Sequence, residues 1–317
     1  MSGHSGAKAV VAAMGANMAI AAMKLLAWAV TGAASMLAEA VHSAADCANQ
    51  ILILIGGKAS RRKATPLHPF GFGRDRYLAG FVVAIILFSM GGLFAWYEAY
   101  HKFQEVAAGH PNDLLESPWW WVPVAVLLGA CVAESLSLRT AVRESRPEKG
   151  ARGWLNFIRT TKSPELPVIL LEDVAALIGL VFALVGVSMT LVTGSGYWDA
   201  GATVGIGALL ICVAVVLAQE IMSLLIGESA SDEEIEAISA ALSSTQGVGG
   251  IIHIRTVHLG PDEVLVAAKI AVDGDESAGE VARTIDAAEQ AVRAASPIVG
   301  PIYLEPDIAR PGQGDQS

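Results

Sequence analysis

Charged residues are scarce in this sequence. Of its 317 residues, 16% are Asp, Glu, Lys or Arg and 53% are hydrophobic, whereas a soluble domain has about 25% charged residues. The deficit argues against a soluble globular protein and indicates a chain that resides in a lipid bilayer.

Cysteines and, toward the C-terminus, basic residues are also few. The three cysteines (Cys47, Cys131 and Cys212) lie in apolar runs without Cys-x-x-Cys spacing, so they are predicted to be small core residues and not a disulfide framework. Residues 228–317 contain 5 Lys or Arg against 16 Asp or Glu, whereas residues 1–227 contain 16 against 15. The acidic segment argues against nucleic-acid binding, which needs a basic surface, and indicates a water-facing part that follows a nearly neutral membrane part.

Six segments are apolar over the roughly 20 residues that a membrane helix needs. They are residues 9–30, 34–57, 78–97, 119–138, 166–192 and 200–226. The first is too long and too rich in alanine to be a cleaved signal peptide. The sequence therefore predicts six transmembrane helices.

The loops between these segments alternate in basic charge. Residues 58–76 contain six Lys or Arg and residues 139–162 contain seven, whereas residues 98–117 contain only Lys102 and residues 193–199 contain none. The positive-inside rule places both basic loops, and with them both termini, in the cytoplasm. We expect a multi-pass protein of the cell (inner) membrane.

After residue 227 the pattern becomes that of a small water-soluble domain. "SDEEIEAISAALSST" predicts a helix capped by Ser231. "GGIIHIRTVHLG" and "EVLVAAKIAV" predict two strands joined at Gly260-Pro261, followed by a helix in "SAGEVARTIDAAEQAVRAA" and a strand in "GPIYLEPDI". We predict a transmembrane domain (1–227), a cytoplasmic α+β domain with both helices on one face of its sheet (228–308) and a disordered tail (309–317).

Ionisable residues interrupt two of the apolar segments. His42 and Asp46 are four residues apart, so a helix places them on one face, and an imidazole with a carboxylate suits zinc and similar divalent metals. Glu172 and Asp173 form a second acidic pair within "PVILLEDVAALIGLV". A cation site between the two helices would offset the cost of burying these groups. The alternative is a structural hydrogen bond between His42 and Asp46.

Several segments resemble the cation diffusion facilitators, a family of homodimeric metal/proton antiporters. The resemblance lies in "TGAASMLAEAVHSAADCANQILILIG", "HPFGFGRDR", "YWDAGATVGIGALLI", "LLIGESA" and "GVGGIIHIRTVHLGPDEVLVAAKIAVD", in the order of the family and over nearly the whole chain. It implies six transmembrane helices followed by a ferredoxin-like, metallochaperone-like cytoplasmic domain.

The resemblance also implies a ligand set. The family uses two ligands four apart in its second helix, which His42 and Asp46 match, and two four apart in its fifth helix. Asp173 matches the second of these, but its partner position is Ile169. Glu172 lies about 100° around the helix from Asp173 and completes the site only if the helix is locally distorted. A branch of the family carries this Glu-Asp pair without the histidine.

Weaker candidates lie outside the spans. His68 and Asp75, in the basic loop, suit either a cytoplasmic metal site or a simple turn. The family's metal site in the cytoplasmic domain is expected to survive here only as Glu305 and Asp307.

The expected function is export of a divalent cation in exchange for protons by a homodimer in the lipid bilayer. Zinc is the favoured cargo, with manganese, iron or cobalt as alternatives, and no cofactor is required. The metal ligands would be His42, Asp46 and Asp173, with Glu172 auxiliary. Two other hypotheses remain: a transporter-derived metal sensor or scaffold, which Ile169 favours, and an intramembrane metal-dependent hydrolase, for which the spans contain no HExxH run.

Overall fold

The computed structural model describes residues 3–110 and 113–308, without the side chains of residues 3–14 and 16. The predicted disordered tail (309–317) lies outside the described residues. The described chain divides into two compact units. One contains the residues up to Gly56 and those from Leu78 to Ile221, and the other contains Gly57–Tyr77 and the residues from Met222 onward. The predicted boundaries after residues 227 and 308 stay a prediction.

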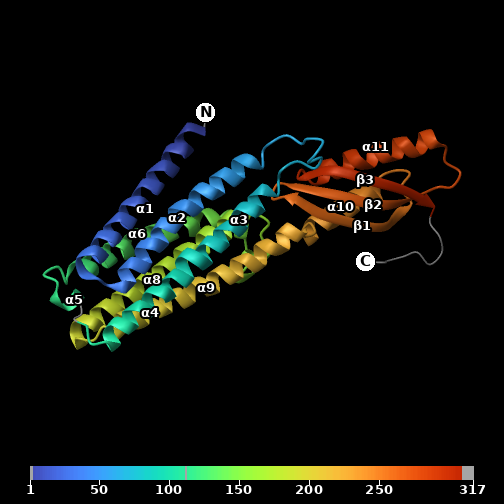
Figure 1. The fold of residues 1–317 in the computed structure, drawn as a ribbon. Helices are drawn as coiled ribbons and strands as arrows, with labels where there is room; N and C mark the ends of the chain where they lie inside the picture. Colours follow the sequence, from blue (N-terminus) through green and yellow to red (C-terminus); the bar gives the residue numbers. More distant parts are fainter. Residues whose placement is uncertain (1–2, 111–112, 309–317) are drawn as a thin grey trace. The chain divides into compact units, whose positions relative to one another are not determined.

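Long helices form the first unit (Figure 1). In chain order the helical elements are α1 (Gly3–Thr31), α2 (Ala34–Ala59), α3 (Asp75–Ile86), the π-helical turn η1 (Leu87–Leu93), α4 (Phe94–Ala107), α5 (Asp113–Glu116), α6 (Val122–Lys149), α7 (Trp154–Thr160), α8 (Glu165–Thr193) and α9 (Tyr197–Ile226). Helix α6 packs against both α8 and α1.

All six apolar segments are helical, as the sequence predicts. Among the described residues, four helical stretches are long and apolar enough to cross a membrane, and they are Asp75–Ala107, Val122–Lys149, Glu165–Thr193 and Tyr197–Ile226. The described apolar part of α1, Asn17–Thr31, is shorter than a full span. Helix α2 is long but less apolar, because it carries Glu39, His42, Asp46 and Asn49.

Glycines allow the helices of this unit to approach closely. A Cβ added at Gly207 of α9 would lie 2.3 Å from Cδ1 of Trp96, and one added at Gly92 would lie 2.4 Å from Cγ1 of Ile211. The indole N–H of Trp96 donates to the carbonyl of Val204 at 3.1 Å. Close contacts of this kind drive helix association where lipid removes the hydrophobic advantage of packing.

A buried carboxylate fixes the beginning of α2. Oδ2 of Asp199, in α9, accepts a hydrogen bond from the backbone N–H of Ala34 at 2.7 Å, and Oδ1 accepts from the N–H of Ser35 at 3.3 Å and from its hydroxyl. An acid at a helix N-terminus satisfies free N–H groups and interacts favourably with the helix dipole. No local pattern in the sequence indicates this cap.

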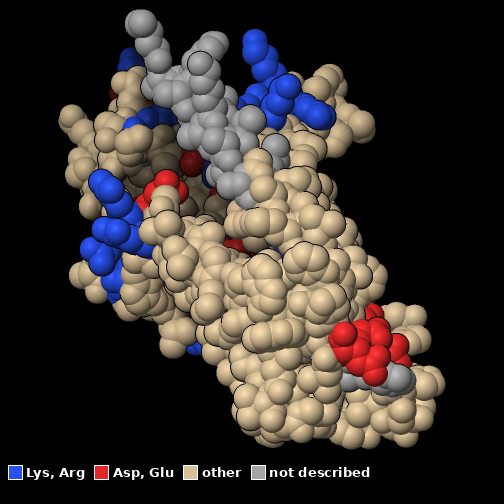
Figure 2. Space-filling model, turned by 90° about the vertical axis from the view of Figure 1, so that its left-hand side faces the viewer, with Lys and Arg blue, Asp and Glu red and all other residues tan. Residues whose placement is uncertain are grey.

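The surface of the protein carries wide areas without charge. Figure 2 shows large continuous regions that contain no Lys, Arg, Asp or Glu, with the charged residues gathered in separate patches. Many large apolar side chains of the long helices are exposed, among them Leu26, Ile55, Leu78, Val132, Val185 and Val192. Such a surface suits lipid tails, which cover apolar side chains without cost.

The second unit contains a three-stranded sheet and two helices. Its elements are α10 (Asp232–Ser244), β1 (Gly250–Gly260), β2 (Glu263–Val272), α11 (Ala278–Ala295) and β3 (Val299–Ile308). The strand order is β1-β2-β3, with β1 antiparallel and β3 parallel to β2. This confirms the predicted α-β-β-α-β order. Ser231 begins α10 in a capping box with Glu234, as its sequence predicts.

The core of this unit lies between one face of the sheet and both helices. Val264, Val266 and Ala268 of β2 alternate toward that face and pack with Ile238 of α10 and Val292 of α11. Helices α10 and α11 also contact each other, so both cover the same face, as predicted.

The loop between α2 and α3 packs within this second unit. A Cβ at Gly73 would lie 2.6 Å from the carbonyl oxygen of Leu259, so only glycine permits this approach of the loop to β1. Arg76 pairs with Asp262 at 2.7 Å beside it. His68 stacks on Phe72 with ring centroids 4.6 Å apart and is exposed.

Candidate functional site

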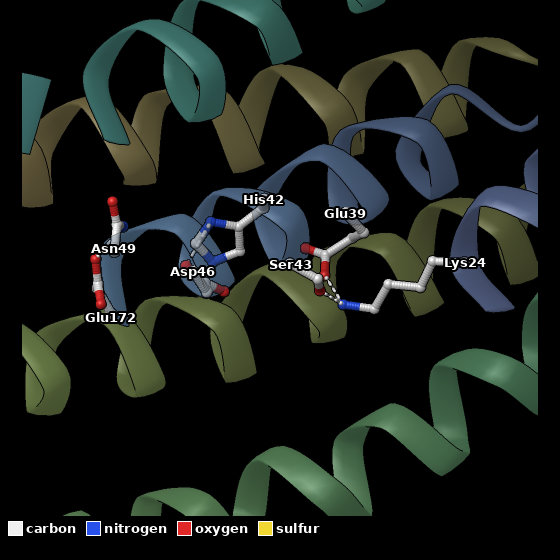
Figure 3. A network of polar contacts seen from close by, with 7 residues as sticks. All are labelled: Lys24, Glu39, His42, Ser43, Asp46, Asn49 and Glu172. Carbon is white, nitrogen blue, oxygen red and sulfur yellow. Dashed lines mark hydrogen bonds and ion pairs between the residues drawn. The ribbon is translucent and has the colours of Figure 1, made fainter. Parts of the chain in front are cut away.

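The polar residues of α2 form one stripe along the helix. Glu39, His42, Asp46 and Asn49 are spaced three or four residues apart, which places them on the same face. Figure 3 shows these side chains in a row, with Lys24 of α1 at one end and Glu172 of α8 at the other.

His42 and Asp46 lie at the centre of the row. His42 Nδ1 is 3.6 Å from Asp46 Oδ1, and the His42 side chain is 1% exposed and that of Asp46 16%. Both ring nitrogens of His42 and Oδ1 of Asp46 are buried without a hydrogen-bond partner in the part of the chain that the structure describes. An unsatisfied buried polar atom costs about 1–3 kcal/mol. Because a neutral imidazole has one N–H and one lone-pair nitrogen, one ring nitrogen of His42 and Oδ1 of Asp46 are available to a cation.

The two acidic residues of α8 face different helices. Oε1 of Glu172 accepts a hydrogen bond from the side-chain amide of Asn49 at 2.6 Å, and Glu172 is buried against α2. Oδ2 of Asp173 accepts from the hydroxyl of Ser137, in α6, at 3.0 Å. Neighbouring residues of a helix point about 100° apart, so Glu172 is the acid directed toward the His42–Asp46 stripe.

Helices α2 and α8 run antiparallel along this seam. Asn49 meets Glu172, whereas Glu39 meets Gly179, where an added Cβ would lie 2.7 Å from Glu39 Oε1. His42 and Asp46 therefore lie opposite the stretch of α8 between residues 172 and 179. Ile169 is one turn beyond Glu172 in the other direction, outside this stretch.

A buried ion pair closes the other end of the row. Lys24 Nζ lies 2.9 Å from Oε2 of Glu39 and 2.8 Å from the hydroxyl of Ser43. The exposed fractions of the Lys24 and Glu39 side chains are 1% and 0%. The second oxygen of Glu39, Oε1, is buried and has no partner among the described residues.

The predicted ligands are not gathered into one cluster here. Within residues 3–110 and 113–308, no group of three or more His, Cys, Asp or Glu side chains is close enough to hold a metal ion. His42 and Asp46 form a pair, Glu172 lies against α2 beside Asn49, and Asp173 points to α6. The assignment of these four residues as ligands stays a prediction.

Glu305 and Asp307, the two acids expected to remain from the family's cytoplasmic metal site, both pair with a lysine. Lys269 Nζ lies 2.9 Å from Oε1 of Glu305 and 3.1 Å from Oδ2 of Asp307. These two carboxylates raise the pKa of Lys269. His258 is buried, with Nδ1 3.1 Å from the carbonyl oxygen of Gly260. The ammonium of Lys269 occupies the place beside both carboxylates.

Sequence reasoning missed two parts of this arrangement. The sequence shows Asn49 as a polar residue of the apolar α2 segment, but its contact with Glu172 depends on how α8 packs against α2. No pattern in α1 connects Lys24 to Glu39, because the pair depends on how two helices pack.

The comparisons with known proteins agree with this architecture. A family model described as the cation efflux transmembrane domain matches residues 10–226, and one described as the cation efflux protein cytoplasmic domain matches residues 230–305. The chain belongs to the cation diffusion facilitator family. This family consists of metal transporters and not enzymes, so the chain is an integral multi-pass membrane protein and the hydrolase hypothesis is abandoned.

Cation diffusion facilitators of several kinds are similar to this chain. The proton-coupled zinc antiporter SLC30A9 of Xenopus laevis, a mitochondrial protein, is 32% identical over 269 residues, which cover 84% of this chain and 47% of that protein. The magnetosome protein MamB of Magnetospira sp. is 28% identical over 271 residues, 83% of this chain and 82% of that one. The chain spans about half the length of the first curated relatives it matches.

Among solved structures, the nickel form of a MamM CTD variant is 19% identical. The match has a TM-score of 0.24 and covers 25% of this chain and 100% of the MamM chain.

Proposed function

We propose that this cation diffusion facilitator is a secondary transporter that exports a divalent cation from the cytoplasm in exchange for protons. Membership of the family and relatives named as zinc antiporters and cation-efflux pumps support cation efflux. The observation that carries the proposal is the buried His42–Asp46 pair, whose polar atoms have no hydrogen-bond partner among the described residues.

The chemistry of this pair favours zinc. A neutral imidazole nitrogen and a carboxylate oxygen are common zinc ligands, whereas manganese prefers an all-oxygen set. Glu172 is the α8 acid that contacts α2, through Asn49, and its carboxylate would have to leave Asn49 to join the pair. Asp173 would join only if it left Ser137. Manganese, iron and cobalt are the alternative cargoes, and the vesicle transport assay described below compares them with zinc.

Exchange with protons follows from competition for the same atoms. A histidine must be neutral and a carboxylate ionised to bind a metal, so binding releases protons and protonation releases the metal. If the bundle opens alternately to the two sides of the membrane, a higher proton concentration outside drives export. We place both termini in the cytoplasm, as the basic loops favour, and propose the cell membrane as the location.

The cytoplasmic domain is proposed to hold two copies of the chain together. The family model that matches residues 230–305 supports this role. Deleting residues 228–317 should weaken dimerisation more than it weakens metal binding by the membrane part. A dimer that is unchanged after truncation, as measured by light scattering in detergent, would place the contacts between the spans.

Transport in reconstituted vesicles tests the function. With a pH gradient imposed, the purified protein should take up zinc, and His42→Ala and Asp46→Ala should each abolish uptake while the protein still folds. His101→Ala is a matched control, because His101 is exposed in α4 and its ring contacts that of Tyr97 at a tilt, with centroids 4.5 Å apart, far along the chain from the site. Uptake by the two site variants at the wild-type rate would refute the site.

The metal sensor or scaffold is the second candidate. Ile169, at the position where the family pattern has a ligand, favours it. A protein that binds zinc and dimerises but moves no metal, under any gradient, would establish this alternative.

A further inference from the structure

Lys24 brings a full positive charge into the middle of the helical unit. Its ammonium is buried and contacts Glu39 at 2.9 Å and Ser43 at 2.8 Å. Burying a charge costs several kcal/mol unless a partner compensates. Because Ser43 lies three residues before Asp46 on α2, the ammonium lies about one helical turn from the pair to which we assign the cation.

Glu39 has the properties of a metal ligand whose carboxylate is engaged by Lys24 instead of by a metal. It precedes His42 by three residues on the same stripe of α2, so its carboxylate is one position away from the pair. Lys24 engages only Oε2, whereas Oε1 is buried, has no partner among the described residues and is pressed against Gly179. An oxygen in that state gains from any cation that reaches it.

We propose that Lys24 is a positioning residue that sets the cation affinity of the site, by holding the Glu39 carboxylate out of the coordination shell of a cation bound at His42 and Asp46. The ammonium acts as an internal cation: it neutralises Glu39 and repels a dication at the neighbouring pair. This inference rests on the proposed function.

Two consequences follow for transport. A site with fewer ligands binds its cargo less tightly, and a transporter must release its cargo as well as bind it. Without the Glu39 carboxylate, the ligands of the cation include fewer oxygens beside the nitrogen of His42. A set with nitrogen favours zinc, whereas manganese prefers oxygen ligands.

Replacing Lys24 in the full-length protein tests the inference. Zinc and manganese affinities are measured by calorimetry for the wild type, Lys24→Met and Lys24→Met with Glu39→Gln. Lys24→Met should tighten binding of both metals, by about tenfold for manganese and by less for zinc, where a factor of ten equals about 1.4 kcal/mol. In the double variant the extra gain for manganese should disappear, because the released carboxylate is gone.

Two further variants keep the test decisive. Lys102→Met removes another buried lysine, whose ammonium contacts the carbonyl of Gly32 and the carboxylate of Glu105. Gly32 precedes His42 by ten residues, and Glu105 lies in α4. This variant should leave both affinities unchanged. Lys24→Gln retains N–H donors for Glu39 and Ser43 without the charge, so it replaces Lys24→Met if that variant does not fold. It should raise both affinities as well.

The outcomes separate the two proposals. If the wild type binds neither metal, the proposed function fails. If the wild type binds zinc but the neutral variants bind both metals at wild-type affinity or more weakly, the metal site stands and the role of Lys24 is refuted. The pair with Glu39 is then a structural contact between α1 and α2.

Discussion

The orientation of the two acids in α8 yields the sharpest prediction. Glu172 faces α2 through Asn49, whereas Asp173 faces Ser137 of α6. Removing one charge at each position without changing its shape distinguishes their roles. Glu172→Gln should weaken zinc binding more than Asp173→Asn, which is the reverse of what the alignment with the family's ligand positions implies.

The geometry gives the size of the effect. Asn49 is three residues beyond Asp46, a rise of about 4.5 Å, and Glu172 is in direct contact with Asn49. The Glu172 carboxylate would thus lie about 7 Å from a dication bound by His42 and Asp46. At an effective dielectric constant of about 20, this attraction is about 5 kcal/mol.

Desolvation and competing protons remove much of that attraction. We expect Glu172→Gln to raise the Kd for zinc by about tenfold to a hundredfold, where each factor of ten equals about 1.4 kcal/mol. Asp173→Asn should cost less than tenfold. Calorimetry on the full-length protein at one fixed pH measures both.

A third variant, at residue 169 of α8, tests the same register of α2 and α8 by adding a ligand. Ile169→His restores the ligand that the family pattern expects. Because residue 169 lies outside the stretch of α8 opposite His42 and Asp46, the added imidazole should change the zinc affinity little. A large gain with Ile169→His, together with no loss with Glu172→Gln, would show that the working site uses a different register of α2 and α8.

Two other predictions concern stability. Gly207→Ala places a Cβ 2.3 Å from Trp96 and should lower the thermal midpoint in detergent, at a cost of about 1–3 kcal/mol, whereas Gly129→Ala, with no atom within 4 Å, should not. An unchanged midpoint for Gly207→Ala would contradict the close packing of α4 and α9. Hydrogen bonds from the side chain and backbone of Ser277 lower the pKa of Glu280 below its ordinary 4.5, so the Glu280 carboxylate stabilises the folded domain above that pH and loses this contribution as the pH falls through its folded pKa. An NMR titration of Glu280 should show the lowered pKa, and Ser277→Ala should return it toward the ordinary value.

The fold follows largely from the sequence, because it depends on patterns within single segments. Apolar runs of helix length mark the spans, and alternation along "EVLVAAKIAV" marks β2, whose Val264, Val266 and Ala268 are buried on one face. The capping residues Ser231 and Ser277 mark where α10 and α11 begin. Each of these signals is local, so a single chain displays it.

The site depends on packing between helices, which local patterns do not encode. The sequence shows that Glu172 and Asp173 point about 100° apart, but not which of them faces α2. It shows a lysine in α1 but not that Glu39 pairs with it, and it gives no sign that Asp199 caps α2. Register and rotation of the helices decide all three contacts.

The coordination of bound zinc tests the central claim most directly. X-ray absorption spectra of the full-length protein with one equivalent of zinc should show an imidazole nitrogen at about 2.0–2.1 Å together with oxygen ligands. In His42→Ala the nitrogen contribution should disappear or the zinc should no longer bind, whereas His101→Ala should give the wild-type spectrum. A spectrum of His42→Ala that keeps the imidazole nitrogen at full affinity would show that the zinc binds elsewhere, and the site between α2 and α8 would be refuted.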